Sequence, residues 1–293
     1  LLTLQERYQN DLCIKLVAPT GKAAARLTES IVDAVERLKQ TFAQEPNKRE
    51  IIENLQIPMN AETIHRLLGV RFFSEETRYH ADNPLPLDVL VVDEASMIDL
   101  TLMAKLLNAL KPETKLILLG DKDQLASVEA GAILGELGRF VNAVKPTYSS
   151  PMAQYLQATT GMTLPSEDKV NAISDSICYL QVSRRFGANP EVGELATTVN
   201  LGNATKSWQL LQQYQQHQDK HCGVYLTDFA HYLTNKDDVQ QCKACVKLIV
   251  DRAAEEYARY LQQIPSDGVL QEDKVRSIFA AFNHIRFLTA LRV

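Results

Sequence analysis

The sequence lacks the features that mark a membrane or secreted protein. Its 293 residues contain no apolar run of about eighteen residues, the length that spans a bilayer, and no charged-then-apolar leader at the start. The formal net charge of -5 at pH 7 provides no overall basic field, so a nucleic-acid partner would have to be bound by local patches. We therefore expect a cytoplasmic protein with no membrane partner.

Cysteines are few and irregularly spaced, which fits reduced thiols better than a disulfide framework. The chain has five of them, an odd number. Cys242 and Cys245 form one C-x-x-C pair, and His221 and Cys222 precede it, so a zinc site has to be considered. The surrounding periodicity predicts a helix with the two cysteines one turn apart, and four ligands at the spacing of a structural zinc site are not evident. We favour two half-buried thiols over a metal.

A complete phosphate-binding loop is also missing. The stretch "KLVAPTGKAAARLTES", residues 15–30, has the strand, Gly-Lys pair and helix of such a loop. In the pattern G-x-x-x-x-G-K-[ST], however, Leu16 stands at the first glycine position and Ala23 at the hydroxyl position. The glycine lets backbone N–H groups surround the phosphates and the hydroxyl holds Mg²⁺. Gly21 and Lys22 therefore need another explanation.

The first half of the chain alternates strand-like and helix-like segments. Residues 12–17, 87–92 and 115–121 are short apolar runs typical of a parallel sheet that is buried on both faces. Residues 97–112 lie between the last two runs and have helical spacing, with Asp99 placed to cap the helix. This strand, helix, strand unit predicts a doubly wound α/β domain with ligands at the carboxyl ends of the strands.

The second half is less regular. A segment rich in Ser, Thr, Pro and Gly, from about residue 145 to 175, is predicted to be a linker with at most one short helix. A strand-like run from Ser176 follows, then a turn and several helical stretches. Residues 275–293 are predicted to form one more strand and helix.

Two carboxylates follow the predicted strand at residues 87–92. Asp93 and Glu94 would emerge at the carboxyl end of the sheet, where the first can hold Mg²⁺ on a nucleotide and the second can polarise an attacking water. A pair of solvated acids would look the same in isolation. The next strand strengthens the nucleotide hypothesis because it also ends in polar groups.

That next strand ends in "LLGDKDQL". Gly120 permits a tight turn, Asp121 and Asp123 supply acceptors, and the amide of Gln124 can contact both a water and a phosphate oxygen. An amide beside a γ-phosphate can sense whether that phosphate is present. The two strand ends together predict a nucleotide site.

Five segments resemble the motifs of superfamily 1 DNA helicases, and most closely those of the alpha-subunit family of bacterial exodeoxyribonuclease V. They are "APTGKAAARL" (motif Ia), "TIHRLLG" (Ib), "VVDEASMIDL" (II), "LLGDKDQLASVEAGAILGEL" (III) and "SRRFG" (IV). The resemblance covers nearly the whole chain. It implies a RecA-like motor domain over residues 1–145, a linker over 146–175 and an incomplete second motor domain over 176–293.

The resemblance gives the stretch around Gly21 a role. In this family motifs Ia and Ib face single-stranded DNA, and it implies DNA contacts from Pro19, Thr20, Gly21, Lys22, Thr63 and His65. Hydroxyls, amides and lysines suit phosphodiester contacts that do not read sequence. Two alternatives stay open: Lys22 and Arg26 would also suit a solvated helix face, and His65 could be a core residue.

The resemblance also implies ATP and Mg²⁺ as cofactors. Asp93 would bind the metal through ATP, and Glu94, Gln124 and Arg185 would act in catalysis, with the motif IV arginine reaching the γ-phosphate. No phosphate loop precedes motif Ia, and motifs V and VI do not occur before Val293. We therefore expect a fragment that begins just after a phosphate loop.

The function implied is ATP-dependent 5′-to-3′ translocation on single-stranded and duplex-end DNA, in double-strand break repair and recombination in the bacterial cytoplasm. The expected partners are the beta and gamma subunits of exodeoxyribonuclease V, with the nuclease in the beta subunit. One alternative is a free-standing helicase of the same family. A second, from a different class, is a DNA-binding module without ATPase activity.

Overall fold

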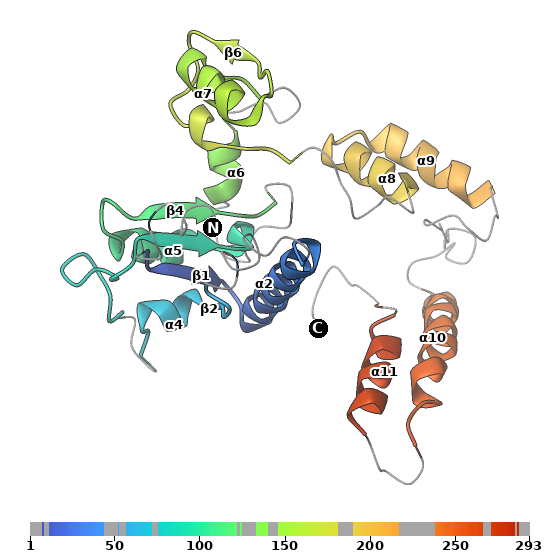
Figure 1. The fold of residues 1–293 in the computed structure, drawn as a ribbon. Helices are drawn as coiled ribbons and strands as arrows, with labels where there is room; N and C mark the ends of the chain where they lie inside the picture. The colour runs from blue at the N-terminus through green and yellow to red at the C-terminus, as the bar shows by residue number, and fades with distance from the viewer. Residues whose placement is uncertain are drawn as a thin grey trace. The chain divides into compact units, whose positions relative to one another are not determined.

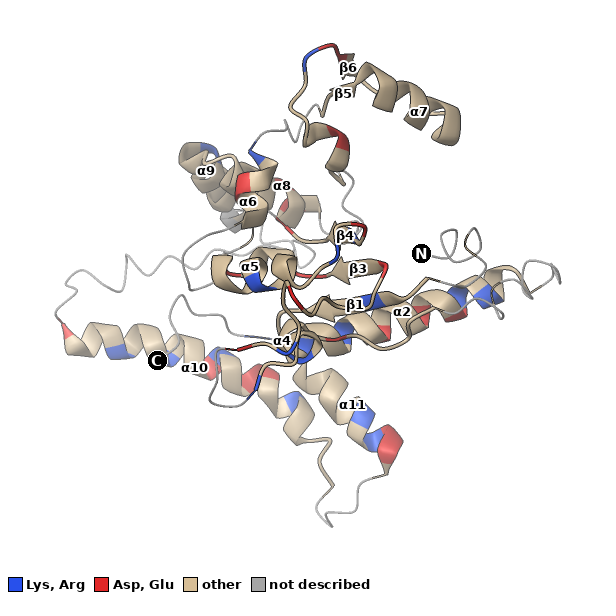
Figure 2. Ribbon diagram, turned by 90° about the vertical axis from the view of Figure 1, so that its left-hand side faces the viewer, with Lys and Arg blue, Asp and Glu red and all other residues tan. Residues whose placement is uncertain are grey.

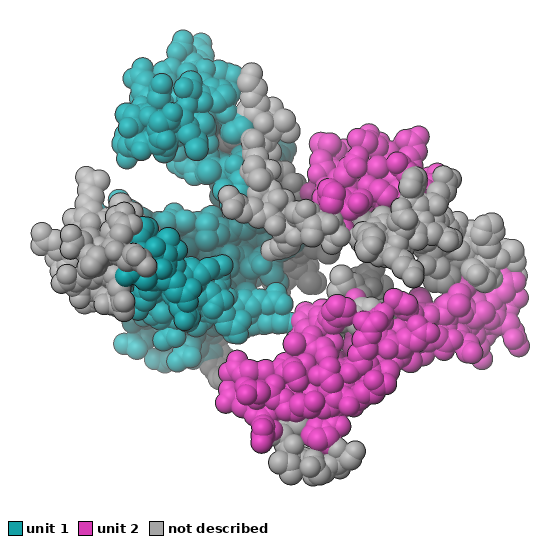
Figure 3. All heavy atoms as spheres, turned by 45° about the vertical axis from the view of Figure 1, so that its right-hand side comes forward, with its two compact units in different colours: residues 1–182 teal, residues 183–293 magenta. Residues whose placement is uncertain are grey.

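A computed structural model gives the fold of the chain. It describes residues 8, 12–43, 52, 57–71, 76–121, 124, 133–139, 146–180, 190–216, 238–265, 271–284 and 286. The chain divides into two compact units, unit 1 over Leu1–Val182 and unit 2 over Ser183–Val293, which Figure 3 distinguishes by colour. Within the described ranges, no helix combines the length and apolar character needed to cross a membrane.

Unit 1 is built on a parallel sheet. Its four strands are β1 (Ile14–Ala18), β2 (Glu62–Thr63), β3 (Val89–Val92) and β4 (Lys115–Leu118), in the order β2-β1-β3-β4. Every pairing is parallel, with Ile14 opposite Val89 and Val89 opposite Lys115. The predicted α/β class with a parallel sheet is therefore confirmed (Figure 1).

Helices connect these strands. Helix α2 (Gly21–Thr41) follows β1, α4 (Ile64–Leu68) follows β2, and α5 (Leu100–Asn108) joins β3 to β4. Asp99 caps α5 as predicted, because its Oδ1 accepts a hydrogen bond from the Leu102 N–H at 2.7 Å. The predicted strand, helix, strand unit is thus present.

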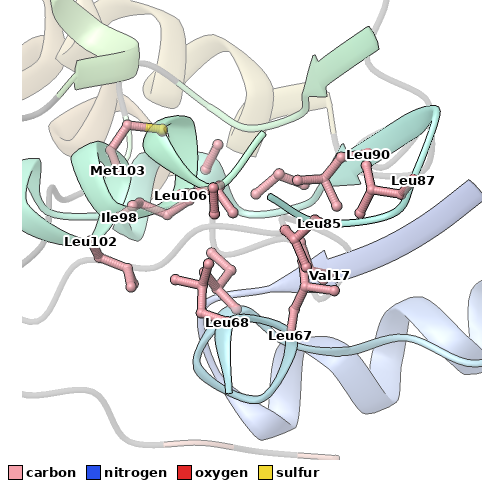
Figure 4. Packing of buried hydrophobic residues seen from close by; sticks show 14 residues of the cluster. Val17, Leu67, Leu68, Leu85, Leu87, Leu90, Ile98, Leu102, Met103 and Leu106 are labelled. Carbon is pink, nitrogen blue, oxygen red and sulfur yellow. The ribbon is translucent and has the colours of Figure 1, made fainter. Parts of the chain in front are cut away.

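Apolar residues pack on both faces of the sheet. The larger cluster joins β3, α4 and α5, and Figure 4 shows it from close by; among its members are Val17, Leu67, Leu68, Leu85, Leu90, Ile98, Met103 and Leu106. The smaller cluster, on the α2 side, contains Ile14, Leu16, Val89 and Val91, with Leu27 and Ala61 packed against it. Burial on both faces explains why the strands read as nearly continuous apolar runs.

The rest of unit 1 carries short elements. They are the 3₁₀ turn η1 (Ala95–Met97), α6 (Ile133–Gly138), β5 (Tyr148–Ser149), α7 (Ser150–Thr160), β6 (Ser166–Glu167) and the 3₁₀ turn η2 (Ser174–Ser176). The segment predicted to be a linker holds the single helix α7 and a two-stranded parallel ladder. The Asp175 carboxylate joins the two ends of this segment, because it accepts hydrogen bonds from the Ser149 N–H at 2.8 Å and the Ser149 hydroxyl at 2.6 Å. Burial raises the pKa of Tyr148, and Cys178 and Asp175 act in the same direction.

The strand predicted from Ser176 is wrong for the residues that can be checked. Residues 177–180 have no strand partner, and Leu180 is 95% exposed. An apolar run forms a strand only where a neighbouring strand accepts its backbone hydrogen bonds, and local sequence does not show whether one is present. Residues 181–189 lie outside the described part.

The described part of unit 2 is helical. It contains α8 (Pro190–Asn200), α9 (Ala204–Gln216), α10 (Val239–Leu261) and α11 (Glu272–Phe282). The hydroxyl of Ser207 on α9 donates to Thr198 Oγ1 on α8 at 3.0 Å, and Phe282 on α11 stacks on Tyr257 of α10 with ring centroids 5.7 Å apart. Helix α11 occupies the region where we expected a strand to begin at Val275. The RecA-like nature of this second half therefore stays a prediction.

Candidate nucleotide and DNA site

The carboxylate pair stands at the carboxyl end of the central strand β3. Asp93 follows the fully buried Val92, and its N–H donates to Val17 O on β1 at 2.9 Å. Glu94 has φ 51° and ψ 40°, the single non-glycine residue with positive φ in the described ranges. A left-handed conformation costs a non-glycine residue about 1 kcal/mol, and such strain gathers at functional sites. Both side chains remain partly accessible.

The backbone of β4 holds this turn from the other side. The Leu119 N–H donates to Val92 O and the Ala95 N–H donates to Leu119 O, each at 2.8 Å. Gly120 follows at a close approach, because a Cβ there would lie 3.1 Å from the nitrogens of both Ala95 and Ser96. Its lack of a side chain, rather than the tight turn expected from the sequence, explains the glycine. Motif II and motif III are thus in direct backbone contact.

The polar residues after β4 lie at the same edge of the sheet. Asp121 and Gln124 are exposed, and the Gln124 N–H donates to Asp121 O at 3.2 Å. Since β3 and β4 are parallel neighbours, their carboxyl ends meet, and the structure brings Asp93, Glu94 and Gln124 to one edge. Asp123 and Arg185 lie outside the described residues, so their predicted roles stay predictions.

Ser96 is a feature that the sequence did not signal. It is 5% exposed, and its Oγ has no hydrogen-bond partner in the described structure. It stands two residues after Glu94, beside the close approach of Gly120. A buried hydroxyl without a hydrogen-bond partner costs free energy, so the Ser96 side chain destabilises this turn slightly.

The segment around Gly21 does not wrap into a phosphate loop. Helix α2 begins at Gly21 directly after Thr20, whose Oγ1 accepts from the Ala23 N–H at 3.2 Å. A Cβ on Gly21 would meet no atom within 4 Å, so neither crowding nor a positive φ requires a glycine there. Pro19 directly follows strand β1, and Lys22 is exposed in the first turn of α2.

Motif Ib lies beside this segment. Thr63 pairs with Ala18 across the β1–β2 ladder and caps α4, with its Oγ1 accepting from the Arg66 N–H at 3.3 Å. Both capping threonines, Thr20 and Thr63, therefore stand at the same edge of the sheet. His65 is exposed, so the alternative that it belongs to the core is wrong.

The basic residues of α2 are exposed, and the same helix also carries acidic residues. Lys22 and Arg26 both face solvent. Figure 2 shows Lys and Arg spaced along α2 with acidic residues between them. Lys22 and Arg26 precede the first acid of α2, Glu29, and a solvated face remains an alternative for these two side chains.

The cysteine pair lies on a helix, as predicted. Cys242 is half-buried and Cys245 is buried on α10. His221 and Cys222 fall outside the described residues. In the ranges that the structure describes, no three His, Cys, Asp or Glu side chains are grouped closely enough to hold a metal ion.

A parallel sheet with carboxylates after one strand and a polar loop after its neighbour is the arrangement of RecA-like domains. The comparisons agree. A family model described as an AAA domain matches residues 2–130. The RecBCD enzyme subunit RecD of Haemophilus influenzae is 44% identical over 307 residues, which cover 100% of this chain and 43% of the relative.

Two further relatives have related names. The RecBCD enzyme subunit RecD of Mycolicibacterium smegmatis is 37% identical over 206 residues, or 70% of this chain and 29% of the relative. The ATP-dependent RecD2 DNA helicase of Deinococcus radiodurans is 35% identical over 134 residues, or 46% of this chain and 15% of the relative. The chain belongs to the RecD-like superfamily 1 helicases, as its motifs predicted, and it spans less than half the length of these relatives.

Proposed function

We propose that the chain is part of the motor of an ATP-dependent 5′-to-3′ DNA helicase, the RecD subunit of an exodeoxyribonuclease V (RecBCD) complex that acts in double-strand break repair and recombination. The observation that carries this proposal is the 44% identity to a RecD subunit along the whole chain. The backbone contact between the Asp93–Glu94 turn and the strand that leads to Gln124 supports it, because this edge is where a nucleotide-driven enzyme needs its polar groups.

Each carboxylate has a separate role in this proposal. Bound Mg²⁺-ATP would supply the phosphoryl group and the metal charge that stabilises phosphoryl transfer. Asp93 follows β3, is bonded to Val17 O of β1 by its backbone N–H, and would hold the metal. Glu94 is held in its unusual conformation by the Ala95–Leu119 bond and would orient and deprotonate the attacking water. Gln124 would contact the γ-phosphate, and Arg185 would neutralise the charge that develops there.

The donor set fits this nucleotide only in part. Mg²⁺ is usually bound by one or two carboxylates together with substrate phosphates, which suits Asp93. A cradle for the phosphates is not formed by Gly21 and Lys22, since both belong to the first turn of α2. We therefore propose that the cradle is supplied by another part of the protein, upstream of Leu1.

The DNA would lie across the carboxyl ends of β1 and β2. Thr20 and Thr63 stand there together with exposed Lys22 and His65, and phosphate contacts from such groups position a strand without reading its sequence. We propose single-stranded and duplex-end DNA as substrates. The proposed protein partners are the beta and gamma subunits, RecB and RecC, because the relatives carry the name of that complex.

ATPase assays test the proposal. We expect residues 1–293 alone to show no measurable hydrolysis, with or without single-stranded DNA, since their sequence contains no G-x-x-x-x-G-K-[ST] pattern. The full-length protein should show DNA-stimulated hydrolysis, and Lys22→Ala in it should impair stimulation by DNA more than nucleotide binding.

Two outcomes would contradict this proposal. Robust hydrolysis by residues 1–293 that Lys22→Ala abolishes would show that Gly21 and Lys22 bind nucleotide phosphates. A full-length gene without a G-x-x-x-x-G-K-[ST] pattern within about 30 residues upstream of Leu1 would favour a DNA-binding module without ATPase activity.

A further inference from the structure

Strand β2, which carries Thr63, has little support from the sheet itself. It is two residues long, it is the edge strand of the described sheet, and its register with β1 consists of Val17 opposite Glu62 and Ala18 opposite Thr63. Such a short edge strand can shift relative to its neighbour unless other contacts fix it. The position of Thr63 relative to Thr20 therefore depends on what else holds β2.

One side chain from α2 supplies such a contact. The Ala61 N–H, just before β2, donates to Thr28 Oγ1 at 2.9 Å, across 33 residues of sequence. The same hydroxyl donates to Ala24 O at 3.0 Å. A hydroxyl has one proton to donate and lone pairs to accept, so the bond to Ala24 orients it to accept from Ala61.

These bonds form a continuous path between the two DNA-facing segments. The Ala24 N–H donates to Thr20 O at 2.9 Å, Ala24 O accepts from Thr28, and Thr28 accepts from Ala61, two residues before Thr63. Leu27 and Ala61 also pack against the same apolar cluster. The start of α2 and the start of β2 are thus tied at a fixed separation.

We propose that Thr28 is a positioning residue for DNA: without touching the strand, it fixes the separation of motif Ia from motif Ib so that both engage successive phosphates of one chain. This inference rests on the proposed DNA-binding function. Thr28 follows the last residue of motif Ia, so it is not one of the proposed DNA-contacting residues. Thr28 is half-buried and its hydroxyl is bonded to Ala24 O and to the Ala61 N–H, whereas Lys22 is exposed.

The chain offers a matched control on the same helix. Thr41 Oγ1 donates to Arg37 O at 2.8 Å, the same bond to the fourth preceding carbonyl that Thr28 makes to Ala24. Thr41 is exposed near the end of α2. Thr28→Val and Thr41→Val therefore remove the same intrahelical bond and keep the branched shape, but only the first removes the link to Ala61.

The test measures binding of labelled oligo-dT to the full-length protein at several salt concentrations. We expect Thr28→Val to raise Kd about tenfold, the size of one uncompensated hydrogen bond, and to reduce the slope of log K against log salt by about 0.7 for each phosphate that the protein no longer neutralises. Thr28→Ser keeps the hydroxyl and should restore both values. Thr41→Val should match the wild type.

ATPase kinetics and thermal melting separate positioning from general stability. In Thr28→Val the DNA concentration for half-maximal stimulation should rise while the rate at saturating DNA is retained. An unchanged Kd and salt slope in Thr28→Val, or a loss of rate at saturating DNA in parallel with Tm, would overturn the inference while leaving the proposed function standing. Failure of the wild-type protein to bind oligo-dT would overturn the proposed function and this inference with it.

Discussion

The two units bury apolar side chains in different ways. Unit 1 packs them on both faces of a parallel sheet, so strands such as β3 are buried along their whole length. In the described part of unit 2 the helices pack in pairs, and the buried apolar residues are Leu210, Tyr214 and Cys245. A helix pair covers one stripe of each helix and leaves the others open.

The open stripes of unit 2 are apolar in part. Val246, Ile249 and Val250 on α10 are each about half exposed, as is Phe279 on α11. Their spacing of three and four residues places the first three on one helix face. The parallel sheet of unit 1 buries apolar residues on both of its faces. The helix pairs of unit 2 would need another layer of structure against their exposed faces to bury the same kind of residue.

Core truncation should give the largest difference between the units. Leu106 on α5 is 0% exposed and Leu210 on α9 is 8% exposed. We expect Leu106→Ala to lower the free energy of unfolding by about 4 kcal/mol and Leu210→Ala by about 2 kcal/mol, because the cost grows with the cavity that cannot close. Urea titration followed by circular dichroism measures both. Equal losses would mean that the pair α8 and α9 is as tightly packed as the sheet.

The carboxylate pair should give the next largest effect, on activity. In the full-length protein Glu94→Gln should leave ATP binding nearly normal and reduce turnover about a hundredfold, the usual effect of losing a positioned general base. Asp93→Asn should weaken Mg²⁺ and nucleotide together. Nucleotide titrations and steady-state ATPase rates distinguish the two variants, and equal effects on nucleotide affinity would show that the roles are wrongly assigned.

Two glycines sharpen the comparison, one in each unit. A Cβ on Gly120 would meet Leu134 Cδ2 at 2.8 Å and two backbone nitrogens at 3.1 Å, whereas Gly202 has φ +68° with no atom within 4 Å of a Cβ. We expect Gly120→Ala to cost about 2 kcal/mol through overpacking and also to reduce turnover, because it displaces the turn that holds Glu94. Gly202→Ala should cost about 1 kcal/mol through its backbone conformation alone.

Melting curves and ATPase rates of the full-length protein check this pair of glycine variants. The decisive measurement is the turnover rate at a temperature at which both variants are folded. A normal rate in Gly120→Ala would show that Glu94 is held without the motif III backbone.

The sequence predicted those elements whose cause is local. Strands β1, β3 and β4 were expected because each is a short apolar run, and α5 was expected from its helical spacing and the Asp99 cap. The carboxylate pair was predicted because parallel strands bring their carboxyl ends together. Periodicity and capping are properties of neighbouring residues, so one sequence is enough to show them.

The sequence did not predict features that depend on distant contacts. The two-residue strand β2 has no apolar run; it pairs with β1, and the residue before it bonds to Thr28. The turn at Glu94 is bonded to Leu119, and the strand expected from Ser176 does not form over residues 177–180, which have no strand partner. The bond from Ala61 to Thr28 and the close approach of Gly120 to Ser96 were missed for the same reason, because each joins residues far apart along the chain.

The smallest expected effects concern charge pairs in unit 2, and they test whether its helices rely on charge where unit 1 relies on burial. Glu256 on α10 has a side chain that is 8% exposed and lies 2.7 Å from Arg252 Nη2 and 3.2 Å from Arg259 Nη1. Glu272 on α11 is 79% exposed and lies 2.7 Å from Arg276. The two carboxylates thus make short contacts of the same kind but differ in burial.

We expect Glu256→Gln to lower the free energy of unfolding by about 1 kcal/mol and Glu272→Gln by about 0.3 kcal/mol, because an exposed pair is compensated by water. In 1 M NaCl, where the screening length is about 3 Å, the Glu272 effect should vanish. Most of the Glu256 effect should remain, because its carboxylate is shielded from the salt. Urea titrations at low and high salt measure both variants. If salt abolished both effects equally, burial of Glu256 would not protect its pairs with Arg252 and Arg259, all within α10, from screening.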